Sequence, residues 1–148
     1  MTKQVNRAEW SEEVGLIKSD LIKSALKRVD SCIKTGHHIE AIALLESLIA
    51  DRLEAGLTRK KREKQPISTL GPLLRDSLNH KIVSENFCEE IRSWSMERNK
   101  ILHEMVKVRN SASGNWRSRM NHARQLALEG RQIHTTLATE VRKIPRAK

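Results

Sequence analysis

Apolar residues recur every three or four positions along four long stretches of this chain, and this spacing constrains the fold more than any other feature. Wound at about 100° per residue, the stretch 85–109 places six large apolar residues on one side of a helix: Phe87, Ile91, Trp94, Ile101, Leu102 and Met105. Residues typical of strands and turns are scarce, since the chain has no Tyr, one Phe, three Pro and six Gly. The pattern therefore predicts an all-α protein.

Helix-ending signals divide the chain into five predicted helices. They cover about residues 11–33, 38–57, 70 or 73 to 78, 85–108 and 116–143. Ser11 and Ser84 are expected to cap the first and the fourth helix, and Gly36 follows the first. Long helices joined by short loops predict an antiparallel bundle of four or five helices. We expect one domain over residues 1–148, with a core of about 10–142 and a basic C-terminal tail.

The charge of the chain points to an anionic partner. Its 28 Lys and Arg residues outnumber its 18 Asp and Glu residues, which gives a net charge of +10 and a pI near 10.1. RNA, DNA and acidic proteins are the natural candidates.

The sequence shows no signal for a membrane or a metal. The N-terminal residues lack the apolar run of a leader, no stretch has the length and apolarity of a membrane span, and the two cysteines lack metal-site spacing. We therefore expect a cytoplasmic protein with no membrane contact, no metal and no cofactor.

One charged residue interrupts the apolar stripe of residues 85–109. Arg98 falls in its middle, where an unpaired guanidinium would be costly, so it needs an anionic or carbonyl partner. Glu46 on the second predicted helix is the expected partner. Asn99 and His103 stand four residues apart and therefore share another face of the helix. A permanent cation, an amide and an imidazole this close together suit a site that acts on a phosphate, and they also suit a buried polar network without chemistry.

The segment Arg98-Asn99-x-x-x-His103, in a late helix of such a bundle, resembles the motif of the HEPN superfamily. Members of that superfamily are small all-helical domains of toxins, phage-defence proteins and RNA-processing factors. Two further segments support the resemblance: residues 40–53 on the second helix, and 69–74, Thr-Leu-Gly-Pro-Leu-Leu, before the motif helix. The order and length of the helices match over about residues 10–142.

The resemblance implies a metal-independent endoribonuclease, acting as a toxin of a toxin–antitoxin or phage-defence system. It also implies a homodimer in which two motifs line one cleft, with an antitoxin or regulatory protein as a further partner. His103 would be the general acid/base at the 2′-hydroxyl or the leaving 5′-oxygen, Arg98 would hold the scissile phosphate, and Asn99 would orient the histidine or bind a phosphate oxygen. RNA carries its own nucleophile, so proton transfer and charge stabilisation are sufficient chemistry. A symmetric dimer would double the supply of histidines.

Basic residues outside the motif are candidates for RNA contacts. They are Arg59, Lys60, Lys61, Arg62 and His122, the first four in a predicted connector after the second helix. A solvated loop explains the same basic run without a ligand. The motif also has an alternative interpretation, in which the protein is a non-catalytic RNA-binding, adaptor or regulatory module and Arg98 and His103 form a structural network.

The remaining histidines, tryptophans and cysteines are expected to be structural. His37 and His38, at the start of the second helix, should cap it or be exposed to solvent, because no Cys, Asp or Glu accompanies them at metal-ligand spacing. His134 is expected on the surface. Core or dimer-interface positions are expected for the tryptophans, and core positions for the cysteines: Trp10, Trp94, Trp116, Cys32 and Cys88.

Overall fold

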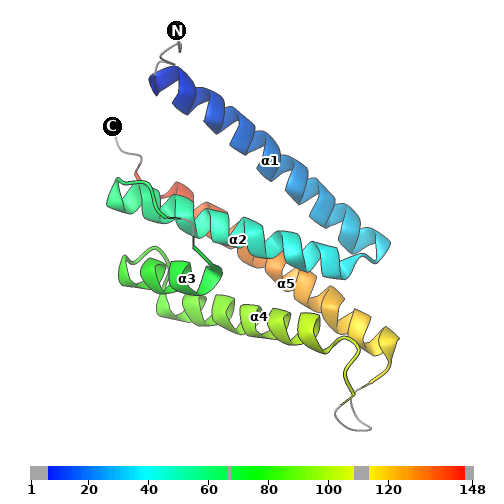
Figure 1. Ribbon diagram of the computed structural model, residues 1–148. Helices are drawn as coiled ribbons and strands as arrows, with labels where there is room; N and C mark the ends of the chain where they lie inside the picture. Colours follow the sequence, from blue (N-terminus) through cyan, green and yellow to red (C-terminus); the bar gives the residue numbers. More distant parts are fainter. Residues whose placement is uncertain (1–6, 67, 109–113, 146–148) are drawn as a thin grey trace.

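A computed structural model describes residues 7–66, 68–108 and 114–145 of the chain, and the side chains of 12–66 in the first of these ranges. Within these residues there are five helices and no strand (Figure 1), which confirms the all-α prediction. The helices are α1 (Arg7–Thr35), α2 (His38–Lys61), α3 (Leu70–Asn79), α4 (Glu85–Glu104) and α5 (Trp116–Arg142). The side chain of Trp10 lies outside the described part.

α2 and α5 form the centre of the bundle. α1 packs on one side of this pair, and α3 and α4 lie on the other (Figure 1). The central helices run parallel, because the Arg59 guanidinium near the end of α2 donates to the carbonyl oxygen of Val141 near the end of α5 at 2.9 Å. α1 and α4 run the opposite way, so consecutive long helices are antiparallel (Figure 1). The two central helices supply most of the largest fully buried side chains: Ile42, Leu45, Ile49, Leu53, Leu57, Leu137 and Val141.

Gly36 allows the chain to reverse between α1 and α2. Its φ of 88° lies in the left-handed region that favours glycine. The amide of His37 donates to the carbonyl oxygen of Cys32 at 2.8 Å, which is the hydrogen bond that closes a helix ending in such a glycine. The turn therefore has a cause that is visible in the sequence.

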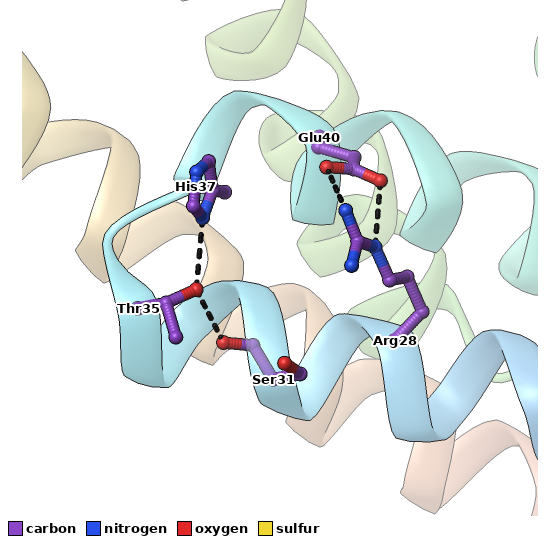
Figure 2. Close-up of polar contacts among 5 residues, drawn as sticks. All are labelled: Arg28, Ser31, Thr35, His37 and Glu40. Atoms are coloured by element: carbon purple, nitrogen blue, oxygen red, sulfur yellow. Dashed lines mark hydrogen bonds and ion pairs between the residues drawn. The ribbon is translucent and has the colours of Figure 1, made fainter.

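Polar side chains hold this turn together (Figure 2). The Thr35 hydroxyl donates to the carbonyl oxygen of Ser31 and lies 2.8 Å from Nδ1 of His37. Because the single hydroxyl proton goes to the carbonyl, Nδ1 of His37 is the donor in the second contact. Across the turn, Arg28 donates to both carboxylate oxygens of Glu40, at 2.8 and 3.0 Å. These contacts fix the antiparallel pairing of α1 and α2.

The first half of α1 is less buried than its second half. Four large apolar residues there are 40% to 69% exposed: Val14, Leu16, Ile17 and Leu21. Val29 and Cys32 in the second half are buried against the core. α1 therefore packs mainly through its C-terminal half.

Two predicted helix starts have different outcomes. Ser84 caps α4 as predicted, since its hydroxyl accepts from the amide of Phe87 at 3.1 Å. α1 begins at Arg7, so Ser11 lies inside the helix and the prediction that it is the N-cap is wrong.

α2 is a full turn longer than predicted. It continues to Lys61, and the chain leaves it at Arg62, whose φ is 58°. The prediction of a connector is therefore wrong for Arg59, Lys60 and Lys61. No Gly or Pro interrupts this run, and cationic side chains in a last turn interact favourably with the helix dipole.

Candidate functional site

Arg98 lies on the apolar side of α4, as the sequence predicts. Ile91, Trp94 and Ile101 on this side are buried. The side chain of Arg98 is only 13% exposed. A guanidinium with only hydrophobic neighbours would be neither solvated nor paired, which is costly. Its hydrogen-bond and ion-pair partners therefore determine whether it is available to bind a ligand.

Two partners hold the guanidinium of Arg98. Its Nη1 lies 2.5 Å from Oε2 of Glu46 on α2, which confirms the expected ion pair. Its Nη2 donates to Oδ1 of Asn99 at 2.6 Å. Nε is buried and has no hydrogen-bond partner among the residues that the structure describes. Both terminal nitrogens are therefore engaged inside the protomer, and the charge of Arg98 is balanced by a carboxylate.

Asn99 and His103 are exposed on the outer surface of α4. Five residues separate Arg98 from His103, which corresponds to about 140° around the helix. Within the described part of the chain, the imidazole of His103 has no hydrogen bond or ion pair. The structure thus places Asn99 beside both groups, whereas Arg98 is held toward α2 and His103 toward solvent.

Several cationic residues lie on the segments that meet at the end of α4 that carries His103. Arg119 of α5 donates through Nη1 to the carbonyl oxygens of Glu104 and Met105, at 2.7 and 2.9 Å, and so caps α4. This contact joins the end of α4 to the start of α5. Exposed cationic residues on the two joined segments are Lys100, Lys107, Arg117 and Arg124. Such a cluster attracts a polyanion.

His122, a predicted RNA contact, has a carboxylate neighbour. Its Nε2 lies 3.4 Å from Oε2 of Glu97, and its side chain is 54% exposed. The imidazole therefore lies between α4 and α5 rather than among the arginines of the bundle end. Its role in RNA binding stays a prediction.

The other predicted RNA contacts lie near the opposite end of the bundle. Arg59 follows Glu46 by about 20 Å along α2. Arg59 is half-buried against α5, and Lys61 lies 3.6 Å from Asp76. Lys60 and Arg62 are exposed. The structure therefore does not bring this basic run together with the motif.

Two histidines, His38 and His134, are buried, and both contradict the sequence interpretation, which expects capping or solvent exposure for His38 and a surface position for His134. His134 on α5 is 3% exposed, so the prediction of a surface position is wrong. Burial and the nearby Arg131 lower its pKa to about 4. His38 is also buried, and burial together with Arg124 lowers its pKa. The sequence held a signal for His134, which stands seven residues before the buried Val141 on the stripe of α5.

The tryptophans separate into different environments. Trp94 is buried, and its Nε1 donates to the carbonyl oxygen of Leu126 at 2.8 Å. Trp116, the first residue of α5, is 62% exposed, so a core position is wrong for it. Cys32 and Cys88 are buried free thiols, as expected.

Among the described residues, one group of neighbouring side chains combines the charged, amide and imidazole groups of a possible chemical site: Glu46, Arg98, Asn99 and His103. In the whole described part of the chain, no three His, Cys, Asp or Glu side chains are placed to hold a metal ion. No helix in the described ranges has the length and apolarity needed to span a membrane.

Comparisons with protein-family models, curated proteins and solved structures found no match. The resemblance to the HEPN superfamily therefore rests on the residues quoted above.

Proposed function

We propose that this protein is a metal-independent endoribonuclease of the HEPN type, a toxin of a toxin–antitoxin or phage-defence system that acts as a homodimer. The observation that carries the proposal is His103: an exposed imidazole without a partner among the described residues, on the end of α4 that is joined to α5. A buried imidazole would normally be hydrogen-bonded within the fold, whereas an exposed one is free to contact a ligand. An accessible imidazole beside a polyanion site is suited to proton transfer.

The reaction needs two proton transfers at one phosphate. The ribose 2′-oxygen attacks phosphorus and loses its proton to a base, while the bond to the 5′-oxygen breaks and that oxygen takes a proton from an acid. His103 supplies one of these groups, and His103 of a second protomer supplies the other. The products are a 2′,3′-cyclic phosphate and a 5′-hydroxyl, and no metal takes part.

Glu46, Arg98 and Asn99 form a hydrogen-bonded chain that prepares the surface next to His103. Arg98 donates to Oδ1 of Asn99, so the amide NH₂ of Asn99 remains as a donor on the face that it shares with His103. We assign Asn99 as the group that binds a phosphate oxygen. Arg98 is then a positioning residue, because both of its terminal nitrogens already have acceptors.

A second candidate function rests on the same ion pair. If the arginine of the motif serves only to neutralise Glu46, the protein is a non-catalytic RNA-binding, adaptor or regulatory module with a structural network at Arg98. The half-buried pair and its 2.5 Å separation favour this alternative for Arg98. They give no structural reason for His103, which lies outside the network.

The deciding experiment is RNA cleavage in EDTA by the purified full chain. We expect fragments of varied RNAs with 2′,3′-cyclic phosphate ends and no cleavage of RNA that carries 2′-deoxyribose throughout. His103→Ala should lower the rate at least about 100-fold, the scale of general acid–base catalysis. His80→Ala is the control and should leave the rate unchanged. His80 is the C-cap residue of α3, a helix that lies next to α4.

Circular dichroism shows whether each variant is folded. Intact RNA with the wild-type chain, or full activity in a folded His103→Ala variant, contradicts the nuclease proposal and leaves the non-catalytic module. Sedimentation should give twice the 17.0 kDa mass of the chain. A monomer with full activity contradicts the two-protomer site.

A further inference from the structure

α4 and α5 enclose a groove on the opposite side of Trp94 from Arg98. Its volume is about 310 Å³. Its deep part is apolar, because Trp94 and Ile133 line it and are each 2% exposed. Three carboxylates line its outer part: Glu90, Glu97 and Glu129.

The floor of the groove is fixed before any ligand arrives. A Cβ added at Gly130 of α5 would lie 2.7 Å from Cζ2 of Trp94, so the absence of a side chain there lets the two helices approach around the indole. The hydrogen bond from Nε1 to the carbonyl oxygen of Leu126 holds the ring in place. A preformed site needs little reorganisation to bind.

The charge of the groove is opposite to that of the protein. Cationic residues outnumber anionic ones by 28 to 18 in this chain, yet Glu90 and Glu129 have no ion-pair partner in the described part of the structure. Glu97 has only His122 beside it, which is a cation only when protonated. The three carboxylates give the groove a local negative charge, which attracts a cation.

We propose that this groove binds a lysine or arginine side chain from a basic segment of a partner protein. The aliphatic stem of such a side chain would lie against Trp94 and Ile133, and its charged end would pair with the carboxylates. The volume is at the lower limit of small-molecule sites, about 300–1,000 Å³, which fits one long side chain.

Charge argues against the two other macromolecular occupants. RNA would bring phosphates against three carboxylates. A symmetric contact between two copies of the groove would place carboxylates opposite carboxylates, because a two-fold axis pairs a patch with itself. The proposal does not depend on the nuclease activity. Since Glu97 directly precedes Arg98, a docked segment would lie beside the motif.

The test is a titration of the full chain with a hexalysine peptide, followed by ¹⁵N NMR at neutral pH and low salt. We expect saturable shifts at the indole N–H of Trp94 and at Ser93 and Gln132, which also line the groove. The net charge of +10 repels hexalysine from the rest of the surface, so binding must be local. The double variant Glu90→Gln/Glu129→Gln should weaken the affinity at least tenfold.

The matched control is Glu12→Gln/Glu13→Gln, which removes the same charge from exposed positions on α1 and should leave the affinity unchanged. The proposal is overturned if neutral hexaglutamine binds equally well, or if the groove variant keeps its affinity while the α1 variant loses it. It is also overturned if RNA shifts the same resonances, or if the groove variant changes the sedimentation coefficient, which would identify a second copy as the occupant.

Discussion

On the side of α4 that faces α2, the charged group is an arginine, and a carboxylate neutralises it at 2.5 Å. On the side that borders the groove with α5, the charged groups of α4 are Glu90 and Glu97, and neither pairs with a Lys or Arg in the described part of the chain. Glu129 of α5 lines the same groove and is likewise without such a partner there. One helix therefore carries a cation that the fold has neutralised and carboxylates that it has not.

The difference follows from solvent. Arg98 is 13% exposed, so leaving it unpaired would destabilise the fold, and Glu46 is needed for stability. The carboxylates of the groove keep contact with water, which lets them stay unpaired at little cost. Charges that folding does not require are the better candidates for binding. By the same reasoning, His103 is a better candidate for chemistry than Arg98.

The largest effect is expected where the two sides meet, at Trp94. Trp94→Ala should lower the free energy of unfolding by about 3–5 kcal/mol, because it empties a buried site and removes the donor to the Leu126 carbonyl. Urea denaturation measures it. Trp116→Ala, at a residue that is 62% exposed, is the control and should stay within about 0.5 kcal/mol of the wild type. Equal losses in the two variants would contradict the packing role of Trp94.

Acid pH should destabilise the fold through the buried His134, which lies on α5. Burial lowers its pKa from 6.5 to about 4, so the unfolded chain takes up this proton first as the pH falls. The stabilisation is complete above about pH 6.5 and is lost as the pH falls to about 4, by up to about 3 kcal/mol. Urea denaturation from pH 7 to pH 4 measures it.

His134→Leu should make the dependence of stability on pH shallower over that range, because the leucine does not titrate. His80→Leu, at a less buried residue, should leave the slope as it is in the wild type. An unchanged slope in His134→Leu would show that the imidazole has the same pKa in the folded and the unfolded chain, which contradicts the lowered pKa.

On the side of α2, Glu46→Ala should lower the free energy of unfolding by about 1–3 kcal/mol, because it leaves the mostly buried guanidinium of Arg98 without a counter-charge. Adding Arg98→Met should recover most of the loss, since the cation is then gone as well. A double-mutant cycle over Glu46 and Arg98 isolates this coupling. A coupling near zero would mean that the pair is screened by water.

The α2 side of this comparison could be predicted from the sequence, and the groove side could not. The helical period places Arg98 within an apolar stripe, and burial then demands a carboxylate such as Glu46. Glu90, Glu97 and Glu129 look like ordinary solvent-facing residues, because they come from two helices. Their proximity depends on how α4 and α5 align, and the contact between Trp94 and Gly130 that sets this alignment has no signal in either helix alone.

Two other predictions from the sequence differ from the structure, and each difference has a local cause. The predicted end of α2 was wrong because a run of cationic residues without Gly or Pro extends a helix as readily as it forms a loop. The predicted surface position of His134 was wrong because the prediction relied on the polarity of histidine, whereas the helical period places His134 on the apolar stripe of α5. For polar residues on a core stripe, such as Arg98 and His134, the helical period therefore predicts burial better than the polarity of the side chain does.

The smallest effect is expected on the groove side. Glu90→Gln/Glu129→Gln should change the free energy of unfolding by no more than about 0.5 kcal/mol, because both carboxylates are exposed and have no ion-pair partner in the described part of the chain. The conservative variant on the other side, Glu46→Gln, removes one charge and should destabilise the fold. Urea denaturation of both variants in one buffer gives the sign of each effect. A destabilised groove variant would show that these carboxylates serve the fold as Glu46 does, and the contrast between the two sides of α4 would then disappear.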